Sequence, residues 1–173
     1  NEFSVHELME YGSIPKHDQV VAEDYITGVY KTVNIELMEV TLSGLRSVFA
    51  PGIRTYAYHG LIIKFSFKKN LAYRGIIRTD KRSLYGPVLG GVLTWLDTKF
   101  HKPIGDTQRV RLENSEFEKA FEVFSDDQLA SRYILTNAFL SRLMRVRNAF
   151  GSASLFGGKV IDCGILNNSM VMF

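Results

Sequence analysis

The sequence predicts an α+β fold: a mostly antiparallel sheet, one helix packed on one face of it, and a β-hairpin at the end of the chain. Every second residue from Leu61 to Phe67 is apolar, which is typical of a half-buried strand. Apolar residues three and four apart between 137 and 150 predict an amphipathic helix. Asn167 and Asn168 separate two apolar runs and favour a tight turn. A partly closed, barrel-like sheet with the helix as a plug is the main alternative.

Length and composition favour one soluble domain over residues 1–173. Apolar residues make up 46% of the chain and charged residues 23%, an ordinary globular balance. We expect a helix and an entry loop over 1–27, strands over 28–80, an irregular connection over 81–106, and an α/β segment over 107–173. The single cysteine, Cys163, lies in an apolar run, so we expect a small buried side chain and no disulfide.

The first half of the chain predicts one short helix and three strands. Ser4 and Glu7 have the spacing of a capping box, which favours a helix in the first ten residues. One long strand is expected from Val29 to Leu42, with Val33, Ile35 and Leu37 on one face. After the strand that ends near Phe67, a turn at Lys69-Asn70 leads to a third strand, Arg74–Thr79. Because this connection is short, we expect these two strands to be antiparallel neighbours.

The connection over 81–106 has only a weak helical pattern. Val88, Val92 and Trp95 could share a helical face, but Gly90 and Gly91 disfavour a helix there. The longest uncharged stretch, Ser83 to Leu96, is 14 residues, whereas a membrane-spanning helix needs about 20. We therefore expect no transmembrane segment in this chain.

From residue 109 the patterns become clearer. Short strands are expected around Val110 and around Phe121. Ser115 with Glu118, and Ser125 with Gln128, have the spacing of helix caps, and Thr136 can cap the main helix. The apolar stripe of that helix consists of Phe139, Leu143, Val146 and Phe150, widened by Leu140 and Met144, and Gly151 can end it. The terminal hairpin is expected from Val160–Leu166 and Ser169–Phe173.

These residues resemble a family of bacterial proteins, domain of unknown function 3137. The specific series is Val110-Arg111-Leu112-Glu113, Glu116-Phe117-Glu118-Lys119, Phe121-Glu122-Val123, Asp126-Asp127-Gln128 and Ala130-x-Arg132-Tyr133-Ile134-Leu135-Thr136. Weaker matches upstream are Glu23-Asp24-Tyr25-Ile26-x-Gly28-x-Tyr30, Gly60-Leu61, Phe65-x-Phe67, and Gly75 before Asp80. The resemblance covers residues 20–173, and Asn137 departs from it where the family usually has proline.

The resemblance implies a setting rather than a reaction. Family members are similar to bacterial membrane-associated proteins with apolar segments before this domain. The chain is then expected to be the soluble portion of a membrane-anchored protein, on the cytoplasmic side of the membrane. The family has no established activity, so no catalytic residue carries over.

No catalytic or metal-binding motif stands out. The four histidines are scattered and form no ligand set, so we expect neither a metal nor another cofactor. Asp126 and Asp127 could hold a hard cation or share a proton, but we favour the interpretation that both sit in the first helical turn after a Ser125 cap. An enzyme that uses Asp126 or Asp24 in a cleft is the alternative to a non-catalytic interaction domain, which is the preferred hypothesis.

Two basic regions supply the binding candidates. Residues 64–82 hold seven basic residues and one acid with aromatic residues between them, and Arg142 and Arg145 share a helix face further on. A solvated strand face, anionic lipid headgroups and nucleic acid are three interpretations of the first region, with nucleic acid the least favoured. A protein partner is also open for the second. The candidates are Lys64, Lys68, Arg74, Arg78, Arg142 and Arg145.

Overall fold

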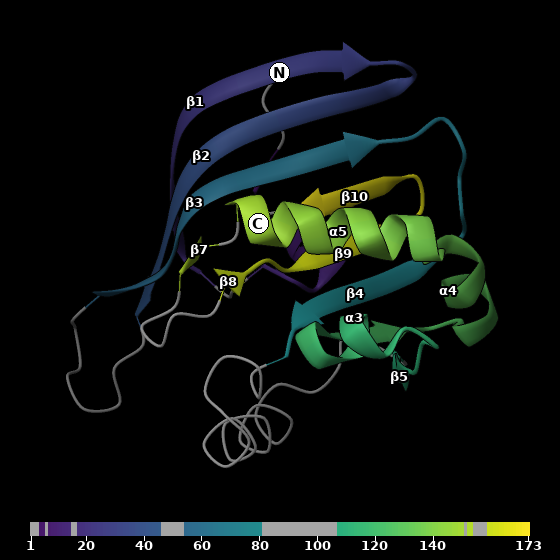
Figure 1. The fold of residues 1–173 in the computed structure, drawn as a ribbon. Coiled ribbons are helices and arrows are strands. Elements are labelled where there is room, and N and C mark those ends of the chain that lie inside the picture. Colours follow the sequence, from purple (N-terminus) through teal and green to yellow (C-terminus); the bar gives the residue numbers. More distant parts are fainter. Residues whose placement is uncertain are drawn as a thin grey trace, which may run out of the picture. The chain divides into compact units, whose positions relative to one another are not determined.

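The computed structural model describes residues 4–5, 7–14, 17–45, 54–80, 107–150, 152–153 and 159–173. The chain forms two compact units, one of residues 1–72 with 164–173 and the other of residues 73–163. The described strands pair mostly antiparallel, and the sheet that they form is not closed into a barrel (Figure 1). The predicted antiparallel architecture is therefore confirmed, and the barrel-like alternative is wrong.

The first unit is a sheet in the order β1-β2-β3-β10-β9. Its long strands β1 (Gln19–Tyr30), β2 (Val33–Leu45) and β3 (Arg54–Ser66) run side by side (Figure 1). The short strands β9 (Cys163–Leu166) and β10 (Ser169–Met172) flank Asn167, which has a positive φ of 53°. β10 pairs antiparallel with β3, so that Val171 lies opposite Lys64.

The strand predicted from Val29 to Leu42 is instead the end of one strand and most of the next. The chain reverses at Lys31 and Thr32, and Tyr30 pairs with Val33 across the turn. Lys31 takes a φ of 56°, a left-handed conformation that is unusual without glycine or asparagine. The turn therefore has no standard sequence signal, and residues 19–27, expected as an entry loop, are in β1.

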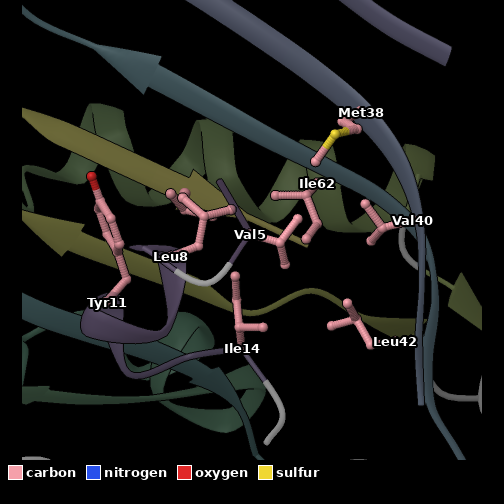
Figure 2. Packing of buried hydrophobic residues seen from close by; sticks show 9 residues of the cluster. Val5, Leu8, Tyr11, Ile14, Met38, Val40, Leu42 and Ile62 are labelled. Carbon is pink, nitrogen blue, oxygen red and sulfur yellow. The ribbon is translucent and has the colours of Figure 1, made fainter. Parts of the chain in front are cut away.

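The core of the first unit lies on the opposite face of β2 from the one that the alternation suggested. Met38, Val40 and Leu42 are buried, whereas Val33, Ile35 and Leu37 are only partly so. The N-terminal segment covers this face: its buried side chains pack with those of β2, with Ile62 of β3 and with Val171 of β10 (Figure 2). The covering side chains are Val5, Leu8, Tyr11 and Ile14.

The covering segment is a short 3₁₀ helix, Glu7–Tyr11, rather than the expected α-helix. The amide of Leu8 donates to the carbonyl of Val5 at 3.1 Å, and that of Gly12 donates to Met9 at 3.1 Å. Both bonds span three residues, which is the 3₁₀ pattern. The tighter turn delivers four apolar side chains to the sheet over a stretch of only ten residues.

β3 and β4 are not the paired neighbours that their short connection suggested. β3 pairs with β10, and β4 (Arg74–Thr79) pairs with β6 (Phe121–Ser125). The connection is held by the terminal turn, because Phe67 donates its amide to Asn168 at 2.7 Å and Leu71 donates to Asn167 at 3.2 Å. Non-local pairing with the C-terminal hairpin therefore replaces the local hairpin.

The described residues of the second unit form strands in the order β4-β6-β5 and three helices. β5 is Gln108–Val110, α3 is Ser115–Ala120, α4 is Gln128–Ile134 and α5 is Asn137–Phe150. A separate two-stranded ladder pairs β7 (Ser152–Ala153) with β8 (Lys159–Val160). Strand Arg74–Thr79 and helix Asn137–Phe150 have the predicted bounds.

Two of the three predicted caps lie one or two residues away from where they were expected. Asn114, not Ser115, caps α3 by accepting from the amide of Phe117 at 3.0 Å, and Asp127, not Ser125, caps α4. Thr136 caps α5 as predicted, accepting from the amide of Phe139 at 3.3 Å. Neighbouring serine, asparagine and aspartate all favour this position, so sequence alone does not choose among them.

The buried face of α5 is narrower than the predicted stripe. Leu140 and Leu143 are buried, but Phe150 is 82% exposed, so its assignment to the core was wrong. Phe150 is the last residue of α5, beyond the part of the helix that packs. Arg147 lies on the buried side instead, with its guanidinium 5.6 Å from the centre of the Phe121 ring, and burial lowers the pKa of Arg147.

Some predictions fall on residues outside the described part. These are the irregular connection over 81–106 with Val88, Val92 and Trp95, and the stop at Gly151.

Ionisation of Tyr58 should destabilise the first unit at high pH. Burial raises the pKa of Tyr58 to about 12 from its ordinary value of 10.0, and its hydroxyl donates to the carbonyl of Leu61 at 2.6 Å. A raised folded-state pKa means that the stabilisation is complete below pH 10 and is lost between pH 10 and about 12. Urea unfolding across this range should show a steeper loss of stability for the natural chain than for Tyr58→Phe. Parallel losses would contradict this.

Candidate functional site

Four of the six predicted binding residues are divided between the two units. Lys64, on β3, lies 3.6 Å from a carboxylate oxygen of Glu36, and both side chains are only about one-fifth exposed, 21% and 20%. Lys68 is exposed just after β3. Arg74 and Arg78 are on β4 in the other unit, where Arg78 lies opposite Glu122. The run of basic residues from 64 to 82 is therefore not one basic face within either unit.

Arg142 and Arg145 do lie together. Both are exposed and they are three positions apart on the helix, so they share the side of α5 that faces away from buried Leu140 and Leu143. Arg109, by contrast, is paired with Glu122 at 3.1 Å. Arg142 and Arg145 are thus exposed neighbours on α5, and their role in binding stays a prediction.

The adjacent acids Asp126 and Asp127 have different structural roles. Asp127 accepts from the amides of Leu129 at 2.8 Å and Ala130 at 2.9 Å, which caps α4. Asp126 lies outside the helix and accepts from the amide of Arg74 at 3.1 Å, which ties the end of β6 to β4. The interpretation that both acids lie in the first helical turn is therefore wrong for Asp126. The shared cation or proton site gains no support, because each carboxylate accepts from a different backbone segment.

The remaining reactive groups form no catalytic arrangement in the described ranges. Asp24 is exposed at a β-bulge in β1, where it takes a φ of 42°. Burial raises the pKa of the Cys163 thiol well above its usual range, and the nearby charge of Asp162 adds to this, so the thiol is unreactive. The ring of His59 lies 2.8 Å from the Thr41 hydroxyl. No described group of three or more His, Cys, Asp or Glu residues could hold a metal ion.

The hollows on the described surface include one in each unit. A hollow of about 570 Å³ near the tip of the β1–β2 hairpin contains Glu36, whose carboxylate accepts from the Tyr25 hydroxyl at 2.8 Å and also faces Lys64. A hollow of about 300 Å³ lies among Asn114, Arg132 and the start of α5. Neither is lined by Asp126 or Asp24, so their walls give no support to a carboxylate enzyme.

The feature that sequence reasoning missed is the outer edge of β1. β1 is the first strand in its sheet and has one strand neighbour in the part of the chain that the structure describes. Eleven of its twelve residues are exposed. Large apolar side chains project from both faces of this strand: Val20, Val21, Ile26, Val29 and Tyr30.

A sequence signal for this edge exists. The stretch from Tyr25 to Tyr30 is uncharged, contains no proline, and holds two aromatic and three β-branched residues. That composition is typical of strands that pair with other chains. It was overlooked because residues 1–27 were interpreted as a helix and an entry loop.

Comparison with family models shows one match, to the protein of unknown function family DUF3137, over residues 56–170. The match covers most of the chain. This chain belongs to the DUF3137 family. The DUF3137 match contains the specific series from Val110 to Thr136 and excludes both β1 and β2. Neither the curated proteins nor the solved structures include a match.

Membership of DUF3137 identifies no activity. The described helices also include none that combines the length and apolar character needed to cross a membrane.

The different roles of Asp126 and Asp127 predict different costs of substitution. Asp127→Ala should lower the free energy of unfolding by about 0.5–2 kcal/mol, because it removes the helix cap. Asp126→Asn should cost less, because the amide oxygen can still accept from Arg74. Urea unfolding with and without Ca²⁺ would test this. Equal losses together with calcium-dependent stability of the natural chain would indicate a shared cation site instead.

Proposed function

We propose that this chain is a non-catalytic interaction domain that binds an extended protein segment along the open edge of β1. The exposed apolar edge strand is the observation that carries this proposal. Strand addition satisfies main-chain groups of both partners, while side chains on the two faces supply selectivity.

The hairpin register indicates which groups are available. In a two-residue hairpin the closing pair is hydrogen-bonded, here Tyr30 with Val33. Bonded and non-bonded pairs alternate along an antiparallel ladder, so Gly28 bonds to β2 while Thr27 and Val29 direct their N–H and C=O groups outward. A partner strand would use these outward groups.

The side chains at this edge also suit a partner. Ile26, Val29 and Tyr30 are 62%, 71% and 65% exposed. Removing apolar surface from water contributes about 25 cal/mol per Å². A strand placed along β1 would cover parts of these side chains and gain hydrogen bonds in the same step.

The cellular setting is also a proposal. We propose that the domain works at the cytoplasmic side of a bacterial membrane, as the soluble portion of an anchored protein. The likeness to membrane-associated bacterial proteins supports this. The organisation as one domain over 1–173, with α5 packed on a face of the sheet, stays a prediction.

Contact with anionic headgroups is the second candidate function. Arg142 and Arg145 form an exposed basic pair on α5, and each basic residue near an anionic membrane contributes about 1 kcal/mol. Nucleic acid has less support, because the aromatic and basic residues of β3 alternate and thus lie on opposite faces.

Edge binding can be tested with short peptides. A biotinylated panel in which β-branched and polar residues alternate, with either Lys or Glu at the centre, should include members that bind the natural chain. Thr27→Pro should abolish this binding, because proline removes an outward amide without removing a bond to β2. Isothermal calorimetry measures the binding, and circular dichroism checks the fold. Unchanged binding by a folded Thr27→Pro chain would exclude the β1 edge.

Headgroup binding can be tested by vesicle flotation. The double variant Arg142→Gln/Arg145→Gln should bind phosphatidylserine-containing vesicles about 30-fold more weakly at low salt, since about 2 kcal/mol is lost. The charge-matched control is Arg111→Gln/Arg132→Gln, which removes two exposed arginines elsewhere in the same unit. Equal weakening in both double variants would indicate net charge rather than a site on α5.

A further inference from the structure

We infer that a partner of the β1 edge is a second copy of this chain, paired β1 to β1 in antiparallel orientation around Thr27. The inference rests on the proposed role of this edge and names the strand that binds there. Three properties of residues 23–31 support it: the direction of the main-chain groups, the fit of the side chains, and the order of the charges.

Symmetry and hydrogen bonding restrict the register. Directly opposite residues in an antiparallel pair project to the same face of the sheet. In a symmetric pair, one residue must therefore lie opposite its own copy, with the two-fold axis midway between the two. The outward main-chain groups of Thr27 make it suitable as a hydrogen-bonded centre. The outward groups of Val29 then extend the ladder on both sides of the axis.

The side chains fit in this register. Ile26 of one copy lies opposite Gly28 of the other, and no atom stands within 4 Å of where a Cβ on Gly28 would be. The Ile26 side chain therefore has space to lie over the partner strand. On the other face Tyr25 lies opposite Val29, and aromatic pairs with β-branched residues stabilise antiparallel strands by about 0.2–1 kcal/mol.

The order of charges distinguishes a second copy from other strands. Residues 25–30 are uncharged, Glu23 and Asp24 precede them, and Lys31 follows. Antiparallel pairing brings Lys31 of each copy toward the two acids of the other. The β1 edge is thus complementary to itself in charge as well as in shape.

The length of the ladder is limited at both ends. The bulge at Asp24 interrupts the regular strand at one end, and the turn at Lys31 ends it at the other. About six residues from each copy then pair. Such a contact is smaller than the roughly 1,000 Å² expected of a stable interface, so the dimer should be weak and should form with increasing concentration.

Like charges placed at the axis provide the main test. Thr27→Lys and Thr27→Glu each put two identical charges opposite one another, so sedimentation velocity should show a monomer at concentrations where the natural chain dimerises. An equimolar mixture of the two variants should dimerise again, because the opposed charges are then complementary. Val21→Lys, at an exposed position on the same strand before the bulge, should dimerise like the natural chain.

Cross-linking tests the register. The Cα atoms of a hydrogen-bonded antiparallel pair are about 5.5 Å apart, within the range that a disulfide spans. Thr27→Cys should therefore form a covalent dimer with oxidised glutathione, while Val21→Cys should not. Buried Cys163 leaves the background low.

The outcomes separate this inference from the broader function. Any of three results would overturn the second-copy inference. The natural chain could stay monomeric at millimolar concentration, the mixture of Thr27→Lys and Thr27→Glu chains could fail to dimerise, or the two cysteine variants could cross-link equally. If peptides still bind the natural chain and not Thr27→Pro, the proposed function stands without it. If dimer and peptide binding are both absent, both proposals fail.

Discussion

The first unit depends on the burial of one half of one face of its sheet. Val5, Leu8, Tyr11 and Ile14 provide that burial from a ten-residue segment, against Met38, Val40, Leu42 and Ile62 (Figure 2). Each fully buried aliphatic side chain contributes about 1.5–3 kcal/mol, so this contact is a large part of what holds the unit together. The 3₁₀ helix is short, however, and of β2 it covers only the buried side chains between residues 38 and 42.

Because the N-terminal segment covers only part of this face, the remaining positions of β2 and β3 on the same face carry polar side chains. Beyond Met38, the same face of β2 carries Asn34 and Glu36, and β3 carries Lys64 and Ser66 opposite them. Polar side chains are suitable there because the N-terminal cover packs against Met38, Val40 and Leu42 of β2 and not against these positions. Glu36 neutralises Lys64 and accepts from Tyr25, which explains why a residue predicted to bind a partner is instead engaged within the sheet.

Sequence reasoning succeeded where one local interaction decides the structure. The Thr136 cap and the apolar period were enough for the bounds of α5, and β-branched residues were enough for Arg74–Thr79. It failed where the decision is non-local. The N-terminal cover selects which face of β2 is buried. β3 pairs with β10 of the terminal hairpin, and β4 pairs with β6, so the expected β3–β4 pair does not form. Neither effect can be read from the alternation within one strand. The β1 edge was missed for a related reason, since a left-handed Lys31 gives no standard turn signal.

The DUF3137 match and the residues of the proposed β1 edge therefore do not overlap. In the specific series, polar side chains are largely occupied with the backbone: Asn114 and Asp127 cap helices, Glu118 accepts from the amide of Leu112 at 2.6 Å, and Asp126 accepts from Arg74. Gly75 belongs with them, because a Cβ there would lie within 2.6 Å of the Tyr73 ring, whose hydroxyl lies 3.1 Å from that of buried Ser131. A sequence pattern of this kind specifies a fold. The β1–β2 hairpin lies outside the family match and exposes unsatisfied strand edge and apolar surface together. Because those are the groups that gain most from a partner, a binding role is more consistent with the hairpin than with the segment by which the family is recognised.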